Sequence, residues 1–551
     1  MRKRIIILLL LTLLIGSSCS IKQTDNSQVP PKFANAIIYS SNNGIHTINF
    51  DGKVDKLIVL KSDVLKLYDK KGEFDEVVLR KVGISRDMSK LFFTVFFRKP
   101  QQGQVAEIFH RALFSIDSDG RNLKQLMPEG IDCYEEYFSP DKNLLAFVGI
   151  STQKEAIYIL SMKDGNVKRV TPWYYDTSDP NGLTFAGITD LIFSQDGKRI
   201  FFVAKTKQDD SYDLNMLDIE TRNSIKTIVR DVMSISLQEW SPDGKTLAFS
   251  VAVSGNQLCP KEKLCTVKSD GSDFKEITTE FYRISSIKWS NDSSKILFHH
   301  LGKAEIKEPA FPKNDFLSVV ESNGTDFKEI GGYDTVGGYW ASDGKEIVAV
   351  IGQDINFAEE TTTTGKLTIY VIDVESMNPL RITPYYTSID KLIFHPSDSN
   401  KIIFTTGIFP YLSTLRILNL DNRSIQTIKS FEENQDITDI VFSPDYKKYF
   451  IRVVRTTVDT AYNMEQSVSL YIYDANTNAL ANKFEGNNEH LTNIEWIDNQ
   501  KICFIKGVMK PKVTEENLGN LCILDVDSGK TVELTKANID LTYGWWLAIN
   551  E

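Results

Sequence analysis

Aromatic residues recur at matching places along this chain of 551 residues, each group a few residues after a threonine or a similar strand end. Aromatic rings offer flat apolar faces with polar tips, which suits them to stack on sugars or to anchor peptides. Aromatic residues at equivalent places of a repeat also pack one repeat against the next, so both interpretations stay open. The candidate ligand-binding residues are Trp173, Tyr174, Tyr175, Phe281, Tyr282, Tyr333, Tyr385 and Tyr386.

Cysteine and histidine side chains supply few further candidates. Cys259 and Cys265 flank a short loop between two expected strands, so in an exported protein we expect a disulfide between them. His299 and His300 are adjacent in an expected strand and point to opposite faces, which makes them a poor metal chelate. The sequence contains neither a Gly-x-Ser-x-Gly elbow nor a P-loop glycine motif. It identifies no catalytic residue, metal ligand or cofactor, and it leaves enzymatic activity open.

The N-terminal segment has the features of an export signal. Three basic residues, 2–4, precede an apolar run, residues 5–15, that is too short to span a bilayer of about 30 Å as a helix. Small residues then lead to Cys19, and the segment resembles the lipobox of bacterial lipoproteins, in which the cysteine is lipidated and becomes the mature N-terminus. Gly16 stands where that family prefers leucine. The resemblance implies a lipid on Cys19; an ordinary cleaved signal peptide is the alternative.

Composition and charge narrow the class of protein. Hydrophobic residues make up 42% and charged residues 25% of the chain, which is typical of a folded protein. The net charge is −10, and no basic stripe follows the N-terminus, so we expect no nucleic-acid partner. We divide the chain into a lipoprotein signal peptide (1–18), a polar flexible tether (19–35) and one repeat region (36–551).

One motif, an aromatic residue followed by a Ser-Pro-Asp-Gly-like turn, recurs through the repeat region, most clearly as Ser-Pro-Asp-Gly after Trp240 and as Ser-Gln-Asp-Gly after Phe193. A fixed period of about 50 residues indicates a propeller or a solenoid array. The residue after the leading hydrophobe falls at 85, 139, 194, 241, 290, 341, 395, 443 and 497, so successive copies lie 47 to 55 residues apart.

The residues of each copy predict four antiparallel strands. Pro presets φ for a turn, Asp caps the turn through its side chain, and Gly takes a positive φ, so the motif joins two strands in a tight hairpin. A third strand such as 157–160 ends in another Asp-Gly-type turn, here Asp164-Gly165, and a fourth strand such as 169–171 closes on Thr. Four antiparallel strands per period form one propeller blade.

This motif resembles the WD40-like (PD40) β-propeller repeat of the TolB protein and of the propeller domains of prolyl oligopeptidases. The resemblance covers roughly residues 36 to 551 and implies an all-β propeller. It says little about activity, because this fold serves many functions.

The chain ends predict how the ring closes. Residues 36–39, 45–48 and 56–59 match strands two to four of a blade, and residues 541–546 supply a first strand alone. Together they complete one shared blade, which gives about ten blades and removes exposed strand edges. Ten exceeds the usual four to eight, so two smaller rings are the alternative.

Strand order also predicts two unlike faces. The first and third connections of every blade are tight turns on one face, whereas the second and the inter-blade connections carry every long loop on the other, where binding residues usually lie. We expect the aromatic groups to begin the inner strands and to surround the channel mouth on the long-loop face. The expected function is a membrane-anchored, exported lipoprotein that acts as a non-catalytic binding or scaffold module for a protein, peptide or glycan at the bacterial cell envelope. The alternative is an envelope enzyme, a lyase or hydrolase, that acts on glycans at the channel mouth.

Overall fold

The protein is described by a computed structural model. The described residues are 33, 36–99, 107–151, 154–172, 174–175, 187–205, 211–221, 225–255, 260–301, 315–330, 334–356, 364–408, 412–432, 434–458, 464–486, 489–508, 518–536, 539–541 and 545–549. Four predicted site residues, Cys19, Trp173, Cys259 and Tyr333, lie outside this part of the chain.

The strands form four-stranded antiparallel blades, which we number in chain order from the blade shared by the two chain ends. Blade 1 contains β42 (Trp546–Ile549), β1 (Ala36–Ser40), β2 (Gly44–Asn49) and β3 (Asp55–Leu60). Blade 2 contains β4 (Glu76–Ile84), β5 (Lys90–Lys99), β6 (Glu107–Asp117) and β7 (Lys124–Gln125). Blade 3 contains β8 (Asp132–Phe138), β9 (Leu144–Ser151), β10 (Lys154–Ser161), β11 (Val167–Arg169) and the added β12 (Tyr174–Tyr175). Blade 4 contains β13 (Ile188–Phe193), β14 (Arg199–Lys205), β15 (Tyr212–Asp218) and β16 (Ile225–Val232). Blade 5 contains β17 (Ser234–Trp240), β18 (Thr246–Gly255), β19 (Pro260–Lys268) and β20 (Lys275–Glu276).

The second half of the chain repeats this order. Blade 6 contains β21 (Phe281–Trp289), β22 (Lys295–Leu301), β23 (Asp315–Glu321) and β24 (Lys328–Ile330). Blade 7 contains β25 (Asp334–Trp340), β26 (Glu346–Asn356), β27 (Thr364–Asp373) and β28 (Pro379–Arg381). Blade 8 contains β29 (Ser388–His395), β30 (Asp398–Ile408), β31 (Leu412–Asn419) and β32 (Ser424–Ser430). Blade 9 contains β33 (Gln435–Phe442), β34 (Lys448–Val458), β35 (Met464–Asp474) and β36 (Leu480–Glu485). Blade 10 contains β37 (His490–Trp496), β38 (Lys501–Gly507), β39 (Leu518–Asp525), β40 (Thr531–Glu533) and the added β41 (Ile539–Asp540). One helix, α1 (Lys61–Tyr68), joins blades 1 and 2.

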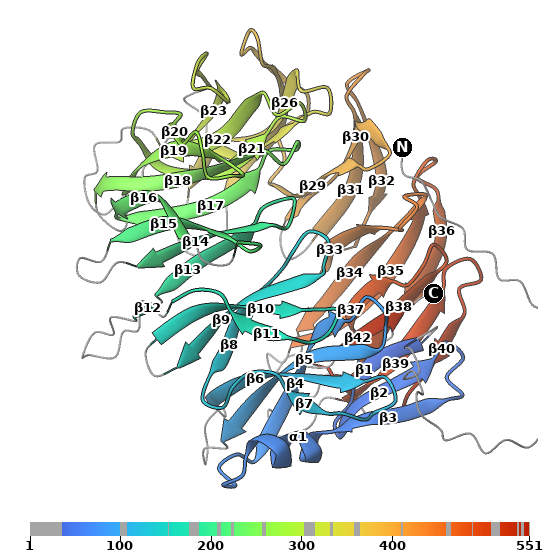
Figure 1. Ribbon diagram of the computed structural model, residues 1–551. Helices are drawn as coiled ribbons and strands as arrows, with labels where there is room; N and C mark the ends of the chain where they lie inside the picture. The colour runs from blue at the N-terminus through green and yellow to red at the C-terminus, as the bar shows by residue number, and fades with distance from the viewer. Residues whose placement is uncertain are drawn as a thin grey trace, which may run out of the picture.

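The hydrophobic core shows that the blades form one ring. Among the described residues, each buried cluster joins two consecutive blades, from blades 1 and 2 around to blades 9 and 10. A further cluster joins blade 10 to blade 1, with Ile37 and Tyr39 packed beside Cys503 and Ile505. Figure 1 shows the C-terminal strands beside the N-terminal ones. The cyclic order of these clusters therefore excludes the alternative of two smaller rings.

The two chain ends share blade 1, as the sequence predicts, but the pairing strand lies later than expected. β42 pairs antiparallel with β1, with Tyr39 opposite Trp546 and Ala36 opposite Ile549. Of the expected first strand, residues 541–546, Trp546 lies in β42, and residues 542–544 lie outside the described residues. Trp545 exchanges hydrogen bonds with Ser40 and donates its indole N–H to the Leu79 carbonyl.

The Ser-Pro-Asp-Gly turns have the predicted caps, and the serine does more than the sequence indicated. Asp243 Oδ1 accepts the backbone N–H of Lys245, 3.1 Å away, and Gly244 has a φ of +71°. Ser241 Oγ donates to Asp243 at 2.6 Å and accepts the N–H of Thr246 at 3.0 Å. The same serine bonds recur in further blades, at Ser85, Ser139, Ser194, Ser290 and Ser443.

Threonine and tryptophan fix the strands to one another. The Thr that closes a blade accepts a backbone N–H from the third strand, as Thr383 does from Ile369 at 2.9 Å. Trp289, Trp340 and Trp496, each at the end of an inner strand, donate the indole N–H to a carbonyl of the preceding blade, as Trp340 does to Lys288 at 3.0 Å, whereas the buried Trp240 indole has no such partner among the described residues. The leading aromatic of the motif therefore joins blades as well as filling the core.

The predicted Cys259–Cys265 disulfide stays a prediction, because Cys259 lies outside the described residues. Cys265 is a free thiol that is buried in the core between blades 4 and 5. Its strand, β19, runs unbroken from Pro260 to Lys268.

Candidate functional site

Strand direction defines the two faces of the ring. We call the face with the first and third connections the turn face and the opposite face the loop face. In blade 2, for example, Ser85–Lys90 turns between β4 and β5 on the turn face, and α1 lies in the connection before β4 on the loop face. β18, β26, β34 and their partner strands extend far into the predicted long loops, and the tips of these connections lie outside the described residues.

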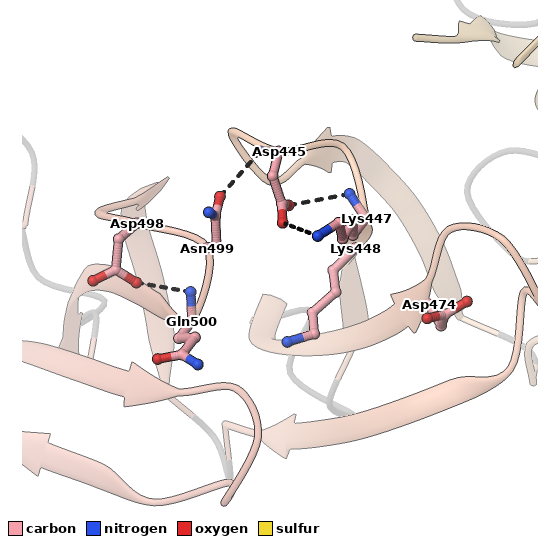
Figure 2. Close-up of a pocket in the computed structure, with 7 residues that line it drawn as sticks. All are labelled: Asp445, Lys447, Lys448, Asp474, Asp498, Asn499 and Gln500. Atoms are coloured by element: carbon pink, nitrogen blue, oxygen red, sulfur yellow. Dashed lines mark hydrogen bonds and ion pairs between the residues drawn. The ribbon is translucent and has the colours of Figure 1, made fainter. Parts of the chain in front are cut away.

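A hollow of about 480 Å³ opens on the turn face between blades 9 and 10 (Figure 2). Its walls are the turns that carry Asp445, Lys447, Asp498 and Gln500. Asn499 Oδ1 accepts the N–H of Asp445 at 3.0 Å, so the two turns are bonded across the hollow. Similar bonds join turns of other blades, as from Asp243 N–H to Ser293 Oγ at 3.2 Å. Because its polar groups already bond within the repeat, this hollow is a consequence of blade packing.

The aromatic candidates do not occupy the expected place. Tyr174 pairs with Glu155 of β10, and Tyr386 pairs with Leu367 of β27. Both residues therefore lie alongside the third strand of the preceding blade. The expectation that such segments begin the inner strands is met by Phe281 and Tyr282, although these residues also pair with β19. The physical reason is that the closing Thr turns the chain back onto the third strand before it enters the next blade.

The described aromatic side chains are half-buried. Tyr174 packs against Phe202, with ring centroids 5.9 Å apart, and burial raises the pKa of its hydroxyl to about 12. Phe281 lies 4.1 Å from the ring of His300, and Tyr386 packs beside Phe404. These contacts serve packing. Tyr282 and Tyr385 instead lie under the cations of Lys261 and Arg381, and the side chain of Tyr175 lies outside the described residues.

Two arginines between blades 2 and 3 form a second candidate, which sequence reasoning missed. Arg111 of β6 lies directly opposite Phe96 of β5, and Arg80 of β4 lies opposite Thr94 one row away. The Arg111 guanidinium carbon lies 4.9 Å from the Phe96 ring centroid and 4.2 Å from that of Tyr134, which belongs to β8. Arg80 lies 5.0 Å from the same Phe96 ring. We call Arg80, Phe96, Arg111 and Tyr134 the arginine site.

The charges of the arginine site are not neutralised by direct contact. Neither Arg80 nor Arg111 makes a side-chain hydrogen bond or ion pair with a described residue, and Arg111 Nε is buried without a partner. Two acids of the inner strand β8 lie close to the site: Asp132 accepts the backbone N–H of Arg111, and the Glu136 carboxylate accepts a hydrogen bond from Thr94 Oγ1. Burial raises the pKa of Glu136, while Thr94 and the two guanidiniums act against that rise. The site thus keeps two cations available to an anion.

The geometry restricts how an anion can bind. Two aromatic rings lie against the Arg111 guanidinium, and its planar N–H groups can make paired hydrogen bonds to a carboxylate or phosphate. Asp132 Oδ1 accepts the backbone N–H of Arg111 at 3.0 Å and contacts His110 Nδ1 at 3.0 Å, which fixes the start of β6. Phe96, Arg111 and Tyr134 occupy the half of the blade interface nearer the loop face.

A partial signal for this site was present in the sequence. Arg111 and Phe96 belong to two strands that are adjacent in the sequence, so an arginine opposite an aromatic residue was a possible prediction. The register of β5 with β6 could not be predicted, because residues 100–106 between the two strands contain no turn motif that fixes the register. The contact with Tyr134 crosses between blades, which a single repeat copy does not reveal.

Known proteins resemble this chain in fold. No protein-family model matches it. Over 158 residues it is 30% identical to the uncharacterized peptidase YuxL of Bacillus subtilis strain 168, which covers 28% of this chain and 23% of that protein. The match therefore spans about a quarter of the relative's length.

Solved structures show the same relation. A eukaryotic initiation factor matches 82% of this chain and 96% of its own at 14% identity with a TM-score of 0.46. The β-propeller domain of the Trilobed protease from Pyrococcus furiosus matches 74% and 98% at 13% identity with a TM-score of 0.32. A TolB from Agrobacterium tumefaciens matches 54% and 88% at 15% identity with a TM-score of 0.26. TolB and other propellers are thus structural neighbours, and the likeness concerns the fold alone.

No helix among the described residues is long and apolar enough to cross a membrane. In the same part of the chain, no three His, Cys, Asp or Glu side chains are grouped so that they could hold a metal ion.

Proposed function

We propose that this protein is an exported lipoprotein, held to a membrane by a lipid on Cys19, that binds a protein, peptide or glycan through an anionic group at the cell envelope. The observation that carries the proposal is the arginine site, in which the Arg80 and Arg111 guanidiniums make no ion pair or hydrogen bond with a described residue. Arg111 is half-buried, and a half-buried guanidinium is costly to desolvate unless a partner accepts its hydrogen bonds, so the uncompensated Arg111 beside the exposed Arg80 indicates a missing anionic partner.

The binding test compares two sets of arginine variants. The mature chain, its Arg80→Gln/Arg111→Gln variant and an Arg121→Gln control are titrated with glutamate-rich peptides and with uronic-acid oligosaccharides. Arg121 lies on the turn face with its side chain 79% exposed, so its loss changes net charge without touching the site. We expect the double variant to lose binding by at least tenfold, because one charge-assisted hydrogen bond contributes about 1.5–3 kcal/mol. Equal binding by all three proteins would refute the assignment of this site.

The anchor is tested separately with Cys19→Ser. The parent should stay with membranes after a salt wash, and the variant should be exported and released, because the lipid is its only proposed attachment. If Cys19→Ser still fractionates with washed membranes, the proposed tether is wrong.

The alternative function is an envelope enzyme that acts on glycans, and it is supported by carboxyl groups whose pKa values are raised. Burial raises the pKa of Glu136, Asp190, Glu239 and Asp390, all on inner strands, and a raised pKa suits a general acid. Asp190 and Glu239, however, accept backbone N–H groups of Leu237 and Trp289 in the next blade. Those bonds give them a structural role, so binding is the function better supported. New reducing ends released from the oligosaccharides in the titration would instead favour the enzyme.

A further inference from the structure

The path of the chain into the ring has a defined direction. β1 is the second strand of blade 1, since it lies between β42 and β2, and second strands begin at the turn face. The chain therefore enters the ring from the turn face at Ala36.

A contact in the next blade fixes this entry point. Phe33 donates its backbone N–H to the carbonyl of Met88 at 2.7 Å, and Met88 lies in the turn between β4 and β5 of blade 2. The Phe33 ring is 3% exposed and belongs to the core between blades 1 and 2. Phe33 is thus held under the inner part of the turn face and not at the outer rim.

The length of the tether limits where a lipid on Cys19 can reach. From Cys19 to Phe33 there are 14 peptide steps, which span at most about 50 Å when fully extended. To bring the loop face to the membrane, the tether would have to pass outward under four strands spaced about 4.8 Å apart and then climb a ten-residue strand of about 33 Å. That path consumes the entire extended length, whereas the turn face is reached directly.

We propose that the turn face is the membrane-facing surface of the ring, so that the loop face with the arginine site points away from the bilayer. This inference rests on the proposed lipid anchor and deepens it, because it predicts that the ligand comes from the aqueous side. A ligand embedded in the same membrane would meet the turn face, whose Asp-capped turns already bond among themselves.

Two lysines of the same region provide a matched pair of labelling sites. Lys53 lies in the turn between β2 and β3 on the turn face, and Lys66 lies in α1 on the loop face. Their side chains are 81% and 77% exposed, so a Cys at either place accepts a maleimide dye equally well. The described cysteines, Cys133, Cys265, Cys503 and Cys522, are buried. Cys259→Ser removes the remaining thiol of the mature chain apart from the lipidated Cys19.

The experiment measures energy transfer to the membrane. Lipidated Lys53→Cys and Lys66→Cys proteins are reconstituted in phosphatidylcholine vesicles that contain a trace of headgroup-labelled acceptor lipid. We expect greater transfer from the label at 53 than from the label at 66. Equal transfer, or greater transfer from 66, would overturn the orientation while leaving the anchor intact. Protein that fails to float with the vesicles would refute the anchor itself, so the two failures are distinguishable. Iodide quenching of both labels in detergent checks that their exposure is equal.

Discussion

At the scale of the residue, a single serine hydroxyl group makes two of the hydrogen bonds that hold its turn. Ser241 is 2% exposed and both donates to Asp243 and accepts from Thr246. Blade 7 has Ala341 at the equivalent place, and there the N–H of Glu346 reaches only Asp343 Oδ1, at 3.4 Å. The chain therefore contains its own comparison between a turn with the serine and one without it.

This comparison predicts opposite effects for two substitutions. Ser241→Ala should lower the free energy of unfolding by about 1–2 kcal/mol, because a buried N–H loses its acceptor. Ala341→Ser should raise it by about 0.5–1.5 kcal/mol by supplying the missing bond. Urea unfolding of both variants, with the slope of the transition checked against the parent, measures the two changes. Loss of stability in Ala341→Ser would show that the buried Ala341 site has no room for the hydroxyl.

Turn aspartates also predict how stability depends on pH. Hydrogen bonds from the Ser290 hydroxyl and from Ser294 lower the pKa of Asp292 from 3.8 to about 2. Because the folded-state pKa lies below the unfolded value, the stabilisation is fully present above about pH 4 and is lost as the pH falls towards 2. In Asp292→Asn, stability should therefore fall less steeply between pH 5 and pH 2 than in the parent. Parallel unfolding curves for the two proteins across that range would contradict the assignment.

Shared strands close the ring at the scale of the element. β42 supplies the inner strand of blade 1, and Trp546 packs in the core between blades 10 and 1. Deleting residues 546–551 removes this strand and leaves the β1 edge unpaired, which invites aggregation. We expect a large drop in melting temperature and faster proteolysis.

A cross-link gives the converse test of the same element. Cysteines in place of Ile38 and Leu547, which are opposite each other in the ladder, should form a disulfide on oxidation. The oxidised protein should melt higher than its reduced form. A truncated chain that melts like the parent, together with no cross-link, would contradict closure through β42.

The repeat elements could be predicted from the sequence because their determinants are local. The aromatic-Ser-Pro-Asp-Gly motif specifies a hairpin through φ preferences and side-chain caps that lie within five residues of each other. The shared blade followed from counting strands at the two chain ends. The position of β42 did not, because it depends on bonds from Trp545 to Ser40 and Leu79, hundreds of residues away.

Non-local contacts explain why the candidate site was missed. The arginine site needs the register of β5 with β6 and the approach of Tyr134 from the next blade. The aromatic pairs were noticed because they recur, and recurrence marked packing at Tyr174, Phe281 and Tyr386. In a repeat protein, residues that break the repeat are therefore better candidates for binding than residues that follow it.

At the scale of the whole molecule, every assignment of a face or site depends on there being one ring of ten blades. The cyclic series of buried clusters, from blades 1 and 2 around to blades 10 and 1, is the evidence for it. A ring of this size also separates the turn face from the loop face, which allows one face to lie toward a membrane while the other binds.

Electron cryo-microscopy of the purified mature chain tests this claim most directly. Class averages viewed along the channel axis should show a single closed ring of ten radial blades, with the four-stranded sheets resolved as spokes. Two smaller rings, an open arc, or a different number of spokes would contradict the architecture and the division into faces that follows from it.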